Sequence, residues 1–266
     1  GTIDPGALPT TAEDAKQLWD WAMQEAMPHF GPFEDAMSTR SRTLFHTGIS
    51  ALMNLHRVLP EDVVADALEL DIPLQSKEGF VRQVLGWREF VRHVHLETDG
   101  FRHLPDGRTV GEANTPDRGA APNALESSNP LPPAWWGTES GLGCLDEVVD
   151  SVWETGYSHH ITRLMVLSNL AALLDVSPRE LTDWFWVAYT DAWDWVVEPN
   201  VLAMGTFATG ELMTTKPYVS GAAYVNRMSD FCSTCAFSPR KDCPLTPLYW
   251  SFLERNEEAL GGNVRM

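Results

Sequence analysis

The four cysteines of this chain are its clearest candidates for chemistry. Cys232, Cys235 and Cys243 form a C-x2-C-x7-C cluster near the C-terminus, and Cys144 stands alone far upstream. Folding can bring a remote thiolate to three clustered ones, and four thiolates suit zinc or an iron–sulfur cluster. Free core thiols and disulfides are the alternatives, although a disulfide within C-x2-C would close a strained ring. The spacing therefore indicates a site for a soft metal without choosing the metal.

The composition is that of a chain with a substantial core and a strongly acidic balance. Apolar residues make up 44% of the 266 residues, and eleven residues are tryptophan. There is no long apolar run and no recognisable signal peptide, so we expect a soluble, cytoplasmic protein. The net charge of −18 argues against a uniformly basic nucleic-acid surface, because such a field repels phosphates. A local basic patch stays possible.

Helical spacing dominates the chain, and no segment shows convincing strand alternation. Apolar residues recur at i, i+3 and i+4, and several segments open with capping residues followed by acids. The predicted helices cover 10–27, 49–58, 60–70, 77–96, 159–176, 177–197 and 245–260. Residues 97–143 and 199–230 are rich in turn-forming residues and are predicted to be irregular. We interpret the whole chain, 1–266, as one all-α domain.

Several long strings resemble the bacterial photolyase and cryptochrome family that carries an iron–sulfur cluster and includes prokaryotic (6-4) photolyases. The strings are FVRQVLGWREFVR, HHITRLM, WFWVAYTDAWDWVVEPNVLAM, KPYVSGAAYVNRMSDFCSTC and LYWSFLERNEEALGGNVRM. The resemblance runs from about Pro28 onward and implies an all-helical FAD-binding domain. All four cysteines match the positions that hold the family's [4Fe-4S] cluster. Family members begin with an α/β antenna domain that has no counterpart here, so we interpret the chain as the C-terminal catalytic part.

The resemblance also implies a FAD site built from several segments. The string HTGISALMNLHRV resembles a phosphate-binding turn, where free N–H groups at a helix start attract anions. Helix capping by Ser50 is the alternative. A buried carboxylate needs a counter-charge, and Arg163 is the candidate partner of Asp191. Val197 stands where the family often has a glutamate, and an acid follows at Glu198. The implied site residues are Thr47, Gly48, Ser50, Gln83, Trp87, Arg88, Arg163, Asp191 and Asn200.

Two adjacent histidines and a set of aromatic residues complete the implied machinery. His159 and His160 align with the paired histidines of the family, and histidine is a natural proton donor near neutral pH. We predict His160 as the acid and His159 as its support. Phe185 stands where a tyrosine is often found. Ordinary core packing is the alternative for the aromatic residues. The residues that match the family's electron-transfer positions are Trp184, Trp136, Tyr218 and Tyr224.

The activity that the resemblance implies is light-driven repair of (6-4) photoproducts by electron transfer from reduced, excited FAD. The lesion would be flipped out of the stack, in single- or double-stranded UV-damaged DNA. A blue-light photoreceptor that repairs little, and a non-photochemical iron–sulfur or zinc protein, are the alternatives. We expect a monomer without a membrane partner. The predicted DNA-contacting patch draws on Arg40, Arg42, Arg82, Arg88 and Arg92.

Overall fold

The computed structural model describes residues 3–4, 6, 8–105, 107, 110 and 119–263. Over these residues the chain is helical and has no regular strand, and Met37 with Ser229 and Asn129 with Val176 form isolated bridges. No helix in the described ranges has the length and apolar character needed to span a membrane. The prediction of an all-α fold is therefore confirmed for the part of the chain that the structure describes.

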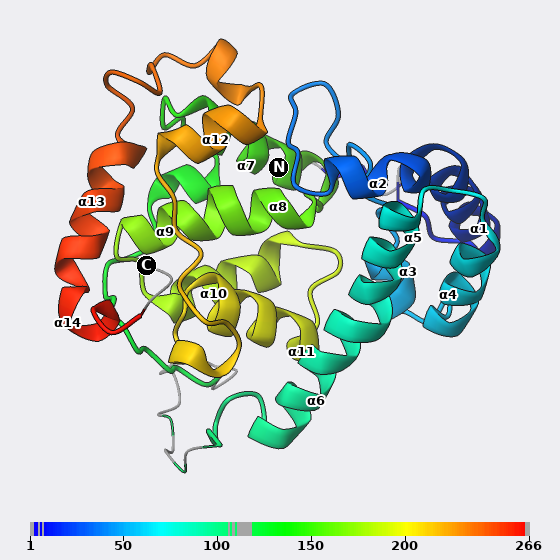
Figure 1. The fold of residues 1–266 in the computed structure, drawn as a ribbon, viewed down its shortest axis with the longest axis horizontal. Helices are drawn as coiled ribbons and strands as arrows, with labels where there is room; N and C mark the ends of the chain where they lie inside the picture. The colour runs from blue at the N-terminus through cyan, green and yellow to red at the C-terminus, as the bar shows by residue number, and fades with distance from the viewer. Residues whose placement is uncertain are drawn as a thin grey trace.

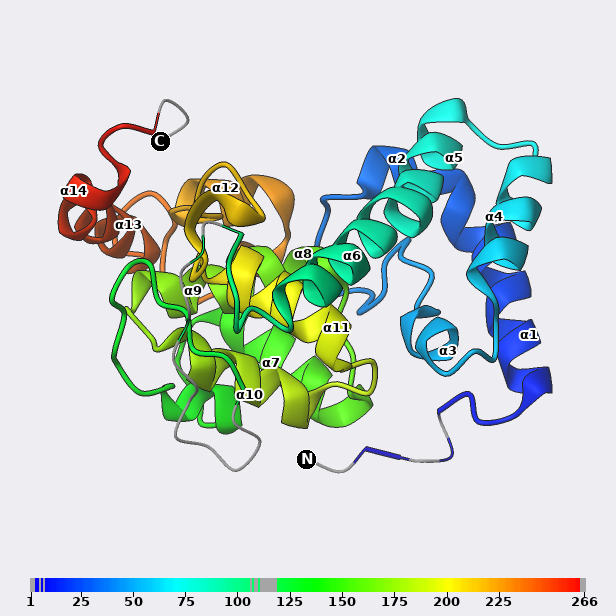
Figure 2. The same ribbon diagram turned by 90° about the horizontal axis from the view of Figure 1, so that it is seen from below.

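The helices gather in two groups that are joined by one long helical stretch (Figures 1 and 2). The first group contains α1 (Ala12–Trp21), η2 (Ala22–Ala26), α2 (Met27–Phe33), α3 (Ser50–Asn54), α4 (Pro60–Glu69) and α5 (Leu74–Val81). The joining stretch continues α5 through η3 (Arg82–Trp87) and α6 (Arg88–Thr98). The second group contains η4 (Pro133–Trp136), α7 (Gly143–Thr155), α8 (His160–Thr162), η5 (Arg163–Ser168), α9 (Asn169–Leu173), α10 (Pro178–Ala188), α11 (Asp194–Val197), η6 (Glu198–Gly205), η7 (Gly210–Leu212), α12 (Ala222–Met228), η8 (Phe231–Ser233), α13 (Leu245–Arg255) and α14 (Glu257–Leu260).

The first group has a buried core of its own. A capping box between Thr11 and Asp14 starts α1, and Trp19 of that helix stacks on Phe80 of α5 with 5.9 Å between ring centroids. The helices α2 and α5 approach closely at Gly31, where a Cβ atom would lie 2.8 Å from the backbone nitrogen of Ser76. Only glycine fits there, and this contact fixes α5 and the start of η3 against α2.

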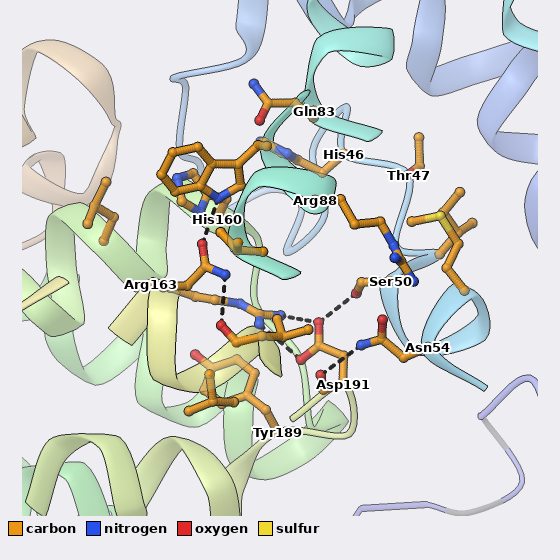
Figure 3. Close-up of a pocket in the computed structure, with 18 of the residues that line it drawn as sticks. His46, Thr47, Ser50, Asn54, Gln83, Arg88, His160, Arg163, Tyr189 and Asp191 are labelled. Atoms are coloured by element: carbon orange, nitrogen blue, oxygen red, sulfur yellow. Dashed lines mark hydrogen bonds and ion pairs between the residues drawn. The ribbon is translucent and has the colours of Figure 1, made fainter. Parts of the chain in front are cut away.

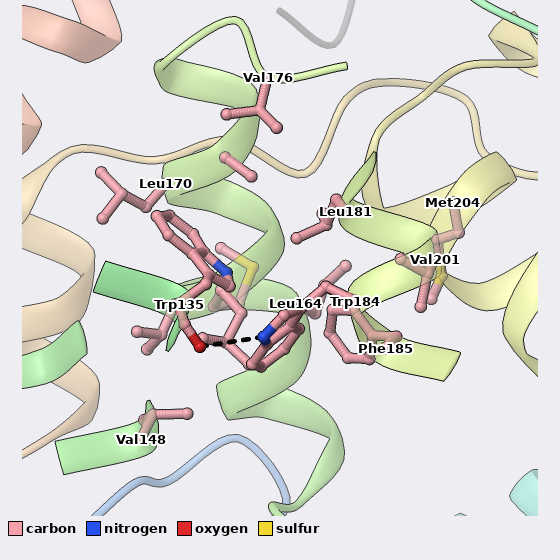
Figure 4. Close-up of a cluster of buried hydrophobic side chains, with 14 of the residues drawn as sticks. Trp135, Val148, Leu164, Leu170, Val176, Leu181, Trp184, Phe185, Val201 and Met204 are labelled. Atoms are coloured by element: carbon pink, nitrogen blue, oxygen red, sulfur yellow. Dashed lines mark hydrogen bonds between the residues drawn. The ribbon is translucent and has the colours of Figure 1, made fainter. Parts of the chain in front are cut away.

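The second group packs around a larger core that is rich in indole rings (Figure 4). Trp135 and Trp184 are almost fully buried. The backbone carbonyl of Trp135 accepts hydrogen bonds of 2.9 Å from the indole nitrogens of both Trp153 and Trp184. A carbonyl shared by two indoles satisfies both donors inside an apolar core, which fixes the orientation of both rings.

Two of the predicted helices end earlier than expected. The helix predicted over 177–197 stops at Ala188, and a new helix begins at Asp194. Between them, the backbone nitrogen of Thr190 donates to the carbonyl of Gly156 at 2.9 Å, which replaces a helical hydrogen bond by a tertiary one. The helix predicted over 49–58 stops at Asn54, and His56 has a left-handed backbone with φ 54°. In both places tertiary contacts override a helical pattern.

The prediction that residues 199–230 are irregular is wrong in part, because η6 continues to Gly205 and α12 lies within this segment. Pro199 is the second residue of η6, which continues directly from α11, so its missing N–H leaves one hydrogen bond out where the two helical stretches join. The helix α7 was not predicted, although Leu145, Val148, Val149 and Val152 give it a regular buried face. Residues 97–143 are largely irregular in their described part, as predicted, although α6 continues to Thr98 and η4 lies within the segment.

Candidate functional site

A cavity of about 290 Å³ lies where the two groups of helices meet (Figure 3). Its walls come from the turn before α3 and from η3 on one side, and from α8, η5, the turn after α10 and η6 on the other. Three of these stretches, η3, η5 and η6, have π-helical hydrogen bonding, which is frequent at functional sites. Ten residues predicted from the sequence line the cavity: Thr47, Gly48, Ser50, Gln83, Trp87, Arg88, His160, Arg163, Asp191 and Asn200.

A buried ion pair forms one end of the cavity. Nη1 and Nη2 of Arg163 each lie 2.9 Å from a different carboxylate oxygen of Asp191. The Ser50 hydroxyl donates to the same carboxylate at 2.6 Å, and Asn54 donates to the Asp191 carbonyl at 3.1 Å. Burial opposes the charge of Arg163, but Asp191 outweighs it and raises the pKa of Arg163. The pair therefore stays charged, and it ties α3 of the first group to the second group (Figure 3).

The turn before α3 contains the residues expected to bind phosphate. Gly48 has φ 68°, a left-handed conformation that favours glycine, and a Cβ atom there would meet no other atom within 4 Å. The turn is therefore open toward the cavity side. The Ser50 hydroxyl is engaged by Asp191, so any contact of this segment with a phosphate would use Thr47 and backbone N–H groups first.

Three histidines lie close together beside the cavity, and two of them, His46 and His160, line it. The rings of His46 and His159 stack at a centroid distance of 4.3 Å and an angle of 12°. Burial and the neighbouring histidines lower the pKa of His46 to about 4 and that of His159 to about 2. His160 is accessible from the cavity. Loss of hydration of its ring inside the site, and then the positive charge of Arg163, lower its pKa to about 4. All three rings are therefore neutral at pH 7.

His46 was not found by sequence reasoning. It directly precedes the predicted phosphate-binding turn, but its partner His159 is far away in the sequence, so no local spacing pointed to the stack. His46 Nε2 and His159 Nδ1 are buried and have no hydrogen-bond partner among the described residues. His46 lines the cavity, and an unsatisfied buried nitrogen in a cavity wall indicates that a bound group or water completes the site.

The joining stretch is held to η6 by side chains of the cavity wall. Trp87 donates its indole N–H to Asn200 Oδ1 at 2.7 Å, and Asn200 Nδ2 donates to the Val196 carbonyl at 2.8 Å. The Arg88 guanidinium lies 4.5 Å from the ring centre of Trp195. Burial lowers the pKa of Arg88 from its usual value. The predicted residues Trp87, Arg88 and Asn200 thus form one connected wall, together with Trp195.

A series of aromatic rings runs from the cavity wall to the surface. Phe185 and Tyr189 line the cavity, and their ring centroids lie 5.2 and 5.9 Å from that of Trp184. Trp153 follows at 6.3 Å, and Trp136, which is 54% exposed, lies 5.9 Å beyond it. Trp153 was not predicted from the sequence. Tyr218 and Tyr224 make no ring contact with this series in the ranges that the structure describes.

The four cysteines surround a second, small cavity next to apolar side chains of α12 and α13. Cys144 begins α7, and Cys232, Cys235 and Cys243 come from η8 and the segments that follow it. Burial and the three other thiols raise the pKa of Cys144 to about 12. Among the described residues, no three His, Cys, Asp or Glu side chains stand close enough to hold a single metal ion. The four thiols thus line one common cavity.

The predicted DNA-contacting arginines do not form a free basic patch. Arg40 pairs with Asp230, Arg42 with Glu154, Arg82 with Glu78, and Arg92 with Glu89. The fifth, Arg88, lies in the cavity wall. Carboxylates next to four of the five guanidinium groups lower the positive potential that DNA would meet.

The comparison with protein families agrees with this architecture of helices around a cofactor-sized cavity. Residues 80–237 match the family described as the FAD binding domain of DNA photolyase. The matched range covers more than half of the chain and contains η3, the paired histidines, the Arg163–Asp191 pair and two of the clustered cysteines. The protein is a member of the photolyase FAD-binding domain family, which supports FAD as its cofactor.

Individual relatives give the same picture. A (6-4) photolyase of Agrobacterium fabrum is 33% identical over 275 residues, which cover 100% of this chain and 51% of the relative. The chain thus spans about half the length of that relative. An uncharacterised protein of Acanthamoeba polyphaga mimivirus is 33% identical over 102 residues, 38% of this chain and 80% of that protein. A crystal structure of a class III photolyase from Agrobacterium tumefaciens superimposes with a TM-score of 0.57 at 19% identity, over 74% of this chain and 39% of that one.

Proposed function

We propose that this chain is the FAD-binding catalytic part of a light-driven DNA repair enzyme that acts on (6-4) photoproducts. The observation that carries the proposal is the single cavity that brings Arg163 and Asp191 together with His160 and Gln83. Membership of the photolyase family and the similarity to a (6-4) photolyase support it.

The residues of the cavity fit a flavin. Phe185, Tyr189 and Trp87 offer apolar surface for a planar ring system, and the Arg163–Asp191 pair offers charged and polar atoms at its edge. The unpartnered His46 Nε2 in the wall is a further polar atom that a bound group can satisfy. Bound FAD, when reduced and excited by light, would supply the electron that starts repair. Arg163 and Asp191 would orient the ring system, and Thr47 with the Gly48 turn would contact the phosphates.

His160 is the proposed proton donor. Its pKa of about 4 makes it neutral while the cavity carries no extra negative charge. An anionic group bound beside it would raise this pKa, because a nearby opposite charge favours the protonated ring. His159, fixed against His46, holds the position of its neighbour in the chain. In this arrangement His160 is protonated when the anionic group is bound beside it and neutral when the cavity is empty.

The four cysteines are the proposed ligands of a [4Fe-4S] cluster. Four thiolates suit either such a cluster or zinc, and the four side chains line one cavity. The resemblance of the surrounding strings to the iron–sulfur photolyases favours the cluster. A bound cluster would supply the positive charge that stabilises thiolates at this buried position. The proposed role is structural, because it joins α7 to the segment between α12 and α13.

The experiment that tests this function measures light-dependent repair directly. The FAD-loaded, reduced chain is illuminated with blue light together with an oligonucleotide that carries one (6-4) photoproduct, and the restored bases are quantified by chromatography. We expect repair in the light, none in the dark, and strong loss of repair in His160→Ala. A chain that binds no flavin, or that leaves the lesion unchanged after full reduction, contradicts the proposal.

A blue-light photoreceptor is the second candidate, and one observation favours it. Four of the five arginines expected to contact DNA are paired with carboxylates, and the net charge is −18. Binding to lesion-bearing DNA in the dark separates the two functions. A photolyase binds the lesion more tightly than undamaged DNA, with an affinity that falls steeply with salt. A photoreceptor shows flavin photoreduction without this preference.

A further inference from the structure

Glu34 is an acidic residue of the cavity wall that no sequence pattern pointed to. It follows the last residue of α2 and lines the cavity together with Gln83 of η3. Gln83 Nε2 donates a hydrogen bond of 2.9 Å to Glu34 Oε1. A carboxylate cannot donate, so the Gln83 amide must turn its nitrogen toward Glu34. The oxygen of the amide is thereby left for another partner.

The pair presents hydrogen-bond acceptors. Within the described part of the chain, no hydrogen bond is donated to Glu34 Oε2 or to Gln83 Oε1. The neighbouring Arg82 is hydrogen-bonded to Glu78, so it leaves both acceptors without a direct bond, although its charge also acts on Glu34. A ligand that fits this place brings N–H or O–H donors.

The acceptor pair lies apart from the ionic end of the cavity. Figure 3 shows Gln83 at the opposite edge of the site from Arg163 and Asp191. The Arg163–Asp191 end suits the charged and polar edge of a cofactor. The Glu34 carboxylate repels phosphate, so its end of the cavity suits the hydrogen-bonding edge of a base. Acidic side chains read bases by accepting hydrogen bonds from base N–H groups.

We propose that Glu34, with Gln83 fixed beside it, recognises the donor groups of a flipped (6-4) photoproduct. This inference rests on the proposed function and specifies which groups of the lesion bind at this end of the cavity. The 5′ base of the lesion carries a hydroxyl at C5 and an imide N3–H, which are two donors for two acceptors. A cyclobutane dimer keeps the imide N–H groups but has no hydroxyl. Glu34 therefore favours the (6-4) lesion over the cyclobutane lesion.

The substitution Glu34→Gln tests the acceptor role with little change in shape. The new amide can still accept from Gln83 through its oxygen, but it presents an N–H group to the ligand where an acceptor was needed. A lost or mismatched contact of this kind costs roughly 5- to 150-fold in discrimination. Asp35→Asn is the matched control, because it removes the same charge from the neighbouring residue, which does not line the cavity.

The measurement is equilibrium binding in the dark of FAD-loaded chains to three oligonucleotides, which carry a (6-4) photoproduct, a cyclobutane dimer or no damage. We expect Glu34→Gln to lower the ratio of (6-4) to cyclobutane affinity roughly 10-fold, with flavin content and Asp35→Asn unchanged. A folding defect would weaken all complexes alike and leave the ratio unaltered. An unchanged ratio in a variant that retains flavin overturns the inference alone. If the unsubstituted chain shows no preference for damaged DNA, the proposed function fails as well.

Discussion

The rings of Trp153 and Trp184 lie 6.3 Å apart, nearly perpendicular to each other at 80°. Trp184 is buried behind the cavity wall, and Trp153 stacks on the exposed Trp136 at 5.9 Å. Trp153 is thus the ring that connects a buried indole to the solvent. Because both Trp153 and Trp184 donate to the Trp135 carbonyl, their separation is fixed by the core rather than by mobile side chains.

We expect Trp153→Phe to slow photoreduction of bound FAD to the rate seen when Trp184 itself is replaced. Phenylalanine keeps the packing of the ring but is much harder to oxidise than an indole, so the series is interrupted. The measurement is the bleaching of flavin absorption under blue light with an external reductant. Trp250→Phe is the control, because Trp250 is 63% exposed on α13 and outside the series. Equal rates in Trp153→Phe and the unsubstituted chain would exclude this route.

The Arg163–Asp191 pair gives a second prediction, on stability. In Asp191→Asn the guanidinium stays buried without its counter-charge, and breaking a buried pair from one side costs about 3–5 kcal/mol. The free energy of unfolding in denaturant measures this loss, and flavin content should fall with it, because the pair lines the cavity. Asp20→Asn removes an exposed partner of Lys16 and should cost far less, because water and salt screen an exposed pair. Equal losses in the two variants would contradict the importance assigned to the buried pair.

Much of the cavity could be predicted from the sequence because its residues lie in long, distinctive strings. Gln83, Trp87 and Arg88 share one helical stretch, and Arg163 follows the paired histidines closely. Residues that act through a distant partner could not be found in this way. Glu34 pairs with Gln83 across two helices, and local spacing contains no information about such a contact.

The helix boundaries show the same limit. The pattern of 177–197 is helical throughout, but Asp191 is drawn out of the helix by Arg163, Ser50 and Asn54, which are all distant in sequence. Several hydrogen bonds to one residue outweigh the few tenths of a kcal/mol that helix propensity contributes. The break is therefore a property of the assembled site. It also exposes the Asp191 carboxylate to the cavity, which an uninterrupted helix would not do.

The stacked histidines predict how stability depends on pH. The pKa of His159 falls from 6.5 in the unfolded chain to about 2 in the folded one, so the unfolded chain binds the proton more readily. This stabilising contribution is complete above pH 6.5 and is lost as the pH falls below it. Between pH 6.5 and about pH 4.5, His159 alone should cost about 2 kcal/mol of unfolding free energy.

Substitution of His159 separates this contribution from general acid unfolding. His159→Gln removes the titrating ring, so the difference in unfolding free energy between this variant and the unsubstituted chain should change steadily from pH 6.5 to pH 4.5. His56→Asn is the control, because His56 is exposed and asparagine tolerates its left-handed backbone. A His159→Gln curve parallel to that of the unsubstituted chain would show that His159 is not held neutral by the fold.

The cysteine cavity gives the last prediction, which concerns the identity of the bound group. Chemical analysis of the purified chain should find iron and acid-labile sulfide in place of zinc, since the four thiols line one cavity and the chain resembles the photolyases that carry an iron–sulfur cluster. Cys144→Ser should lose both elements and unfold more easily, because Cys144 is the proposed ligand that joins α7 to the other three. Thr234→Ser is the control, an exposed change between Cys232 and Cys235 that touches no sulfur ligand. Stoichiometric zinc with no sulfide would reject the cluster and leave the four thiols as a zinc site, whereas a metal-free chain of unchanged stability would make them ordinary buried thiols.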